Sequence, residues 1–174
     1  MAELTRPPVL FTAEEIGERI KALAIEIAQA PQKPDIAMPI LVGGFVFAAD
    51  LVRALWQQGL ELEIEMLWLR SYGDQRVAGA ISMIAGPSED IAGRHVLIID
   101  GVLDAGRTIA KARSLIEAAG AASVRVAVML DKQRPDAVAR ADHIGFAIGN
   151  QFVIGYGMDD AGRYRGLPCI GLAT

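Results

Sequence analysis

Apolar residues recur along the chain in two patterns, the 3.6-residue spacing of amphipathic helices and short continuous runs typical of buried strands. The helical spacing predicts helices over residues 12–30, 45–57 and 109–119. Thr12 and Glu15 have the spacing of a capping box, which indicates that the first helix begins there. Pro31 and Gly120 follow the first and third of these segments and are typical of helix ends.

The apolar and β-branched runs predict strands over residues 36–42, 62–72, 80–84, 95–99, 123–130, 144–148 and 152–154. Residues 73–79 are polar and flanked by glycines, which predicts an exposed loop. Strands that alternate with helices of about 10–15 residues are typical of βαβ units. The expected fold class is therefore α/β, with residues 1–174 as a single domain, a mainly parallel sheet flanked by helices, and a small C-terminal flap.

Ligands of such sheets bind at the carboxyl ends of the strands. Chemistry is therefore expected just after Val42, Ile99, Leu130 and Ile154.

Composition narrows the classes of function. The chain has 174 residues, 52% hydrophobic and 22% charged, which excludes a disordered or coiled-coil protein. A net charge of −4 argues against broad capture of nucleic acid. The longest apolar stretch, residues 39–49, is shorter than the roughly 20 residues that span a bilayer, and no basic-then-apolar leader opens the chain. We therefore expect a cytoplasmic protein without a membrane partner.

Metal centres built from cysteine or histidine are not expected. Cys169 is the one cysteine, so no internal disulfide and no cysteine zinc site can form. His95 and His143 are the only histidines, each begins a predicted strand, and both are interpreted as structural.

The most informative segment, residues 95–109, is a buried strand that leads into two acids, a turn of small residues and a predicted helix start. Ala105, Gly106 and Thr108 would let backbone N–H groups converge on an anion at the positive end of the helix, so a phosphate fits there. Asp100 and Asp104 would then bind sugar hydroxyls or a cation, or accept a proton. From spacing alone, the two acids could equally cap a turn.

This segment resembles the phosphoribosyl-pyrophosphate (PRPP) motif of the type I phosphoribosyltransferases. Four further segments narrow the resemblance to the hypoxanthine-guanine phosphoribosyltransferases. Residues 41–51 resemble their pyrophosphate loop and first core helix, residues 71–73 the start of their flexible lid, and residues 130–132 their base-reading strand end. Residues 152–159 and 163–165 resemble their purine-stacking and pyrophosphate-facing tail.

The resemblance implies that PRPP reacts with hypoxanthine or guanine, with Mg²⁺ as cofactor, to give a purine mononucleotide and pyrophosphate. It leaves hypoxanthine, guanine and xanthine open as bases. The implied partners are these small molecules, with a second copy or more of the chain in a homodimer or homotetramer.

The resemblance also implies residue roles. Asp104 occupies the position of the general base beside N7 of the purine, and Asp100 the position that holds the ribose hydroxyls. Lys132 would donate to the 6-oxo group, which favours 6-oxopurines over adenine. The remaining substrate-binding residues are assigned to the 5′-phosphate (Ala105, Gly106, Arg107, Thr108), the purine (Phe152, Val153), pyrophosphate (Gly43, Gly44, Arg165) and the lid (Ser71, Tyr72). The implied metal ligands are Asp159 and, where the ribose binds, Asp100.

Two positions depart from the family pattern. Gly101 follows Asp100 where the family has a second acid, and Val42 stands where the pyrophosphate loop carries Lys or Arg. Both changes predict weaker PRPP binding. They also motivate an alternative, a regulatory module of the same fold that binds nucleotide or PRPP with weakened catalysis. Asp104, Lys132, Phe152 and Asp159 favour the enzyme over that alternative.

Overall fold

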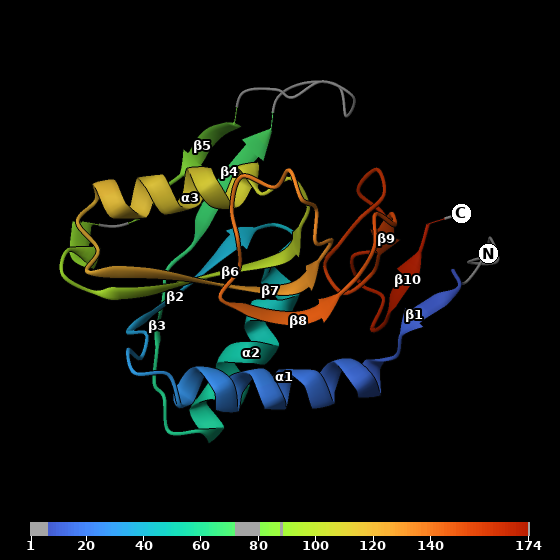
Figure 1. The fold of residues 1–174 in the computed structure, drawn as a ribbon, viewed down its shortest axis with the longest axis horizontal. Helices are drawn as coiled ribbons and strands as arrows, with labels where there is room; N and C mark the ends of the chain where they lie inside the picture. Colours follow the sequence, from blue (N-terminus) through green and yellow to red (C-terminus); the bar gives the residue numbers. More distant parts are fainter. Residues whose placement is uncertain (1–6, 72–80, 88, 174) are drawn as a thin grey trace.

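The computed structural model describes residues 7–71, 81–87 and 89–173, and its centre is a seven-stranded sheet in the order β5-β4-β2-β6-β7-β8, with β3 also paired to β2 (Figure 1). Every pairing in it is parallel except that of β4 with β5. The strands are β2 (Ile36–Leu41), β3 (Glu63–Ile64), β4 (Leu67–Ser71), β5 (Ile81–Ala85), β6 (His95–Leu103), β7 (Ser123–Asp131) and β8 (His143–Ala147). The predicted α/β class with a mainly parallel sheet is confirmed.

Helices cover both faces of this sheet. Helices α1 (Ala13–Ala28) and α2 (Phe45–Gln57) lie on one face and α3 (Arg107–Ala118) on the other (Figure 1). Two groups of buried apolar residues fill the layers, one under α1 and α2 and one under α3. Because both faces are covered, the central strands are apolar on both sides, as their sequences indicated.

The first helix begins where its capping box predicted. The Thr12 hydroxyl accepts a hydrogen bond from the Glu15 N–H at 3.2 Å, and the Thr12 N–H donates to the Glu15 carboxylate at 2.8 Å. Both interactions satisfy donors that the helix itself leaves unpaired.

Two predicted strands differ from the structure by more than a residue at an end. The strand expected over residues 62–72 is divided into β3 and β4, which pair with opposite ends of β2, while Tyr72 and the expected loop at 73–79 lie outside the described residues. The strand expected to end at Ile99 continues to Leu103, because β7 pairs with it as far as Asp131. Asp100 therefore lies within β6 and not in the turn after it.

A second, antiparallel sheet forms the predicted flap. Its order is β1-β10-β9, with β1 (Val9–Phe11), β10 (Ile170–Leu172) and β9 (Val153–Ile154). The first and last of the described strands along the chain therefore lie side by side (Figure 1). The apolar pattern indicated neither β1 nor β10, and it also missed the short 3₁₀ helix Glu89–Ile91. None of the helices in the described part of the chain is both long and apolar enough to cross a membrane.

Candidate active site

The turn between β6 and α3 forms a backbone cradle at the carboxyl edge of the sheet. Gly106 begins this helix with φ of 75°, and a Cβ built there would lie 2.8 Å from the backbone nitrogen of Ala139. No side chain caps α3, so the N–H groups of its first turn point outward at the positive end of the helix dipole. Ala105 and Thr108 are half-buried and the Arg107 side chain is exposed. The arrangement suits a phosphate.

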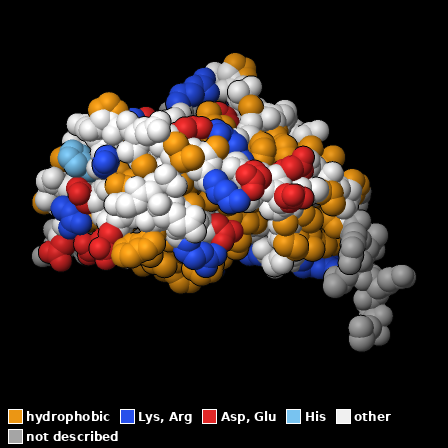
Figure 2. All heavy atoms as spheres, turned by 90° about the horizontal axis from the view of Figure 1, so that it is seen from below, with side chains coloured by type: hydrophobic (Ala, Val, Ile, Leu, Met, Phe, Trp, Pro, Cys, Tyr) orange, Lys and Arg blue, Asp and Glu red, His pale blue; other side chains and the backbone are white. Residues whose placement is uncertain are grey.

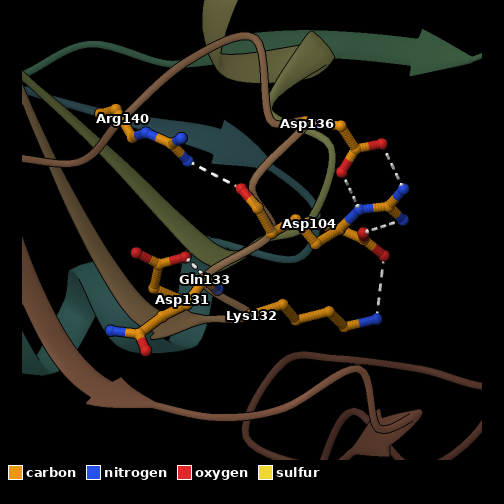
Figure 3. A network of polar contacts seen from close by, with 7 residues as sticks. Asp104, Asp131, Lys132, Gln133, Asp136 and Arg140 are labelled. Atoms are coloured by element: carbon orange, nitrogen blue, oxygen red, sulfur yellow. Dashed lines mark hydrogen bonds and ion pairs between the residues drawn. The ribbon is translucent and has the colours of Figure 1, made fainter.

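Asp104 stands at the start of this turn and contacts two cations (Figure 3). Lys132 Nζ donates to Asp104 Oδ2 at 2.9 Å, and Arg134 Nη1 donates to Asp104 Oδ1 at 3.0 Å. Burial by itself would raise the pKa of Asp104, but the hydrogen bonds and charges of Lys132 and Arg134 outweigh burial and hold it below its usual value. Asp104 is thus ionised at neutral pH.

Lys132 is held at this position by the end of β7. Leu103 of β6 pairs with Asp131 of β7, and the Lys132 N–H donates to the Leu103 carbonyl at 3.0 Å. The Asp131 carboxylate accepts from the Gln133 N–H at 2.7 Å and so shapes the turn that follows. Only 10% of the Lys132 side chain is exposed, which directs its ammonium group toward Asp104.

Arg134 and Asp136 belong to the same cluster, although their sequence positions did not single them out. Arg134 binds the Asp136 carboxylate with Nε at 2.9 Å and Nη2 at 2.7 Å. The one available signal was a second cation two residues beyond Lys132 in a polar segment that follows a strand end.

Asp100 lies further down β6 and accepts a hydrogen bond from the Gly101 N–H at 2.7 Å. Among the residues that the structure describes it makes no ion pair, and burial raises its pKa to about 7. A partly buried carboxylate without a counter-ion is stabilised by hydroxyl donors or by a cation.

The two residues expected to hold Mg²⁺, Asp100 and Asp159, have different hydrogen-bond partners among the described residues. The Asp159 carboxylate accepts from the Gly162 N–H at 2.7 Å and pairs with Arg165 at 2.5 Å. No group of three or more His, Cys, Asp or Glu side chains able to hold a metal occurs within the described ranges. Mg²⁺ commonly takes one or two protein carboxylates and completes its shell with substrate phosphates and waters. Asp100 and Asp159 fit that mode and not a preformed cage.

The loop after β2 packs closely against β6 and the C-terminal segment. Cβ atoms built on Gly101 and Gly157 would lie 2.9 Å and 2.6 Å from the carbonyl oxygen of Gly43. The Gly44 N–H donates to the Ile40 carbonyl at 3.0 Å, so this N–H is already engaged within the loop. Val42 is 47% exposed beside them.

The expected purine-binding segment reaches the same edge of the sheet. Ile148 donates its N–H to the Asp131 carbonyl at 2.8 Å, and Phe152, four residues later, is 52% exposed. Val153 is buried in β9, where it pairs with Leu172 of β10. Ser71 ends β4, and Tyr72 is outside the described residues.

The structure thus brings some of the expected residues into contact and leaves others apart. Asp104 meets Lys132, and a Cβ built on Gly43 would lie 3.9 Å from Asp100 Oδ1. Arg165 pairs with Asp159 and donates to the Gly157 carbonyl at 2.7 Å. The contacts within the described residues do not join Asp159 to Asp104.

Comparison with known proteins relates this chain to one family. Residues 10–161 match the model of the phosphoribosyl transferase domain. The chain is 36% identical over 168 residues to the hypoxanthine-guanine phosphoribosyltransferase of Streptococcus pneumoniae R6, covering 94% of this chain and 91% of that one. It is also 36% identical over 167 residues to the bifunctional protein TilS/HprT of Listeria innocua, of whose length it spans only 25%.

A solved structure agrees with these relatives. A hypoxanthine phosphoribosyltransferase from Staphylococcus aureus superposes with a TM-score of 0.88 at 28% identity, covering 99% of this chain and 97% of the other.

Proposed function

The chain belongs to the phosphoribosyltransferases, and within them to the hypoxanthine-guanine enzymes, and from this membership we propose that it makes purine mononucleotides in purine salvage. It transfers the 5-phosphoribosyl group of PRPP to hypoxanthine or guanine and releases pyrophosphate. A new bond forms between the purine nitrogen and the anomeric carbon, and the bond from that carbon to pyrophosphate breaks. We further propose that residues 1–174 act as one domain.

The contact between Asp104 and Lys132 is the observation that carries this proposal. The two side chains lie 2.9 Å apart beside the uncapped start of α3, so a base-binding pair adjoins a phosphate cradle. Asp104 accepts the purine N7 proton as the new bond forms, and its negative charge stabilises the oxocarbenium-like centre. Lys132 donates to the 6-oxo group and has no acceptor to offer the 6-amino group of adenine.

We assign the remaining roles from the family resemblance. The turn from Ala105 to Thr108 binds the 5′-phosphate through backbone N–H groups, and Asp100 binds the ribose hydroxyls. Asp100 and Asp159 would hold the Mg²⁺ that, when bound with PRPP, offsets the charge of the leaving pyrophosphate. The exposed ring of Phe152 stacks on the purine.

Other segments bind pyrophosphate and exclude water. The Gly43 N–H and Arg165 bind pyrophosphate, which requires Arg165 to exchange Asp159 for its new partner. The resemblance assigns Ser71 and Tyr72 to a lid that excludes water from the reacting centre, and Tyr72 lies outside the described residues.

A steady-state assay tests the proposal. Wild type is supplied with PRPP, Mg²⁺ and each of adenine, hypoxanthine, guanine and xanthine, beside Asp104→Asn and a matched control, Glu117→Gln, whose exposed carboxylate lies near the far end of α3. We expect turnover with 6-oxopurines, unchanged in the control and reduced about 100-fold or more in Asp104→Asn, with nucleotide binding retained. Equal low rates in wild type and Asp104→Asn would instead indicate the regulatory module.

We also propose a homodimer or homotetramer in the cytoplasm. Large apolar side chains on and after α2 are exposed, among them Phe45 at 49%, Trp56 at 62% and Met66 at 41%. Figure 2, from the side of α1, shows hydrophobic areas interspersed with charges of both signs. Sedimentation of the wild type checks the oligomer, and a monomer at micromolar concentration would contradict it.

A further inference from the structure

Arg134 bridges two carboxylates at the candidate active site, and the family resemblance gave it no role. Resting on the function proposed above, we propose that Arg134 is a positioning residue: it holds one oxygen of Asp104 so that the other is free for the purine proton once Lys132 turns to the base. In this role Arg134 keeps the Asp104 carboxylate oriented and ionised after Lys132 has left it.

The two cations occupy different oxygens of Asp104. Arg134 Nη1 contacts Oδ1 at 3.0 Å, and Lys132 Nζ contacts Oδ2 at 2.9 Å (Figure 3). When Lys132 donates to a bound base, Oδ2 becomes the vacant acceptor. The terminal torsion of an aspartate is soft, so a carboxylate with one fixed oxygen stays oriented far better than a free one.

Arg134 is itself anchored and would not follow Lys132. Its Nε and Nη2 form a two-pronged contact with Asp136, at 2.9 and 2.7 Å. Its carbonyl accepts from Arg140 Nη1 at 2.9 Å, which ties the same turn to the chain that follows. A planar guanidinium can bind two carboxylates at once in a fixed geometry, whereas the single ammonium of a lysine cannot reproduce that fork.

Charge supports the same assignment. Among the described residues, the charged groups that contact Asp104 are Lys132 and Arg134, both from the turn after β7. Asp136 lies on the far side of Arg134, whose hydrogen bond lowers the pKa of Asp136, and the charge of Arg107 of α3 acts in the same direction. Burial would raise the pKa of Asp104, and these two cations lower it. After Lys132 has moved to the base, Arg134 is the cation that keeps Asp104 ionised.

A titration of the Asp104 carboxyl carbon by NMR tests this without turnover. The resonance is assigned from Asp104→Asn, and the comparison is Lys132→Met against the double variant Lys132→Met with Arg134→Met. We expect the pKa of Asp104 to rise by roughly half a unit or more in the double variant. Arg94→Met in the Lys132→Met background is the control, because its side chain is also 34% exposed but pairs with Glu63. No rise, or an equal rise in the control, overturns the proposal.

Kinetics separate positioning from stability. In Arg134→Met we expect kcat with hypoxanthine to fall about tenfold or more at constant KM for PRPP. The acidic limb of the kcat/KM profile should move to higher pH. Arg134→Lys should keep that limb near its wild-type pH but recover only part of kcat. If Arg134→Met lowers the melting temperature but leaves kcat and the acidic limb of the kcat/KM profile unchanged, the role of Arg134 is purely structural and the proposal is overturned.

The two proposals can fail separately. If wild type makes no nucleotide from any purine, the proposed function fails, and the NMR titration still decides whether Arg134 controls Asp104. If wild type is active and Arg134→Met retains its rate and its pH profile, only the positioning role fails.

Discussion

Gly101→Ala tests how tightly the pyrophosphate loop packs on β6. The new Cβ would lie 2.9 Å from the Gly43 carbonyl oxygen and 3.4 Å from its carbon. Both are backbone atoms and cannot swing aside as a side-chain end can. Overpacking of this kind costs about 1–3 kcal/mol. For a chain of this length that lowers the melting temperature by about 2–12 °C.

Displacement of the loop that carries Gly43 should weaken the binding of PRPP. If the loop yields, the Gly43 N–H shifts away from pyrophosphate, so the KM for PRPP should rise while the order of preference among purines stays unchanged. Gly101→Asp should behave in the same direction. Although it restores the second acid of the family pattern, its side chain enters through the same Cβ and meets the same carbonyl.

The assay is a pair of measurements with an internal control. Thermal unfolding and the KM for PRPP are compared in wild type, Gly101→Ala and Gly17→Ala. A Cβ on Gly17 meets nothing within 4 Å, and Gly17 lies inside α1, so this substitution should stabilise the protein by up to about 1 kcal/mol. If Gly101→Ala matches wild type in both melting temperature and KM, the reasoning from close packing is refuted.

Three further predictions concern single side chains. Lys132→Ala should raise the KM for 6-oxopurines and leave that for adenine unchanged, and a wild type that prefers adenine would contradict the role of Lys132. Tyr156→Phe removes a 2.5 Å hydrogen bond from the tyrosine hydroxyl to the Asp50 carboxylate, so urea unfolding should show a loss of about 1.5–3 kcal/mol, and an unchanged midpoint would contradict it. Burial lowers the pKa of His143, whose Nε2 is buried without a partner among the described residues, so the unfolded chain binds its proton first. The free energy of unfolding should therefore decrease as pH falls below about 6.5, and His143→Leu should flatten that decrease between pH 7 and 5.

Elements set by local chemistry could be predicted from the sequence, and elements set by distant partners could not. The start of α1 depends on Thr12 and Glu15 alone, and α2 has the predicted bounds. The length of β6 depends on β7, which continues beside it to Asp131, and nothing within residues 100–103 reveals that neighbour. Strands β1 and β10 have three residues each and exist through their pairing with each other and with β9.

The same division applies to the candidate site. Asp104 and the small residues after it were found because an acid, a turn and a helix start are adjacent in the sequence. Lys132 was found through the resemblance, but its contact with Asp104 spans 28 residues and that of Arg134 spans 30. The sequence around Arg134 does not indicate its role, because that role depends on its contacts with the carboxylates of Asp104 and Asp136.

The two departures from the family pattern belong to neighbouring parts of the structure. Val42 adjoins Gly43, and the Gly43 carbonyl lies against Gly101 on one side and Gly157 on the other, where neither has a Cβ. A second acid at position 101 would compete with that carbonyl for space. The loop can therefore hold its present position only because residue 101 is glycine. Introducing an acid at position 101 alone cannot strengthen PRPP binding. By this reasoning, the charge at position 42 and the residue at position 101 must be changed together before the effect of either on the pyrophosphate site can be interpreted.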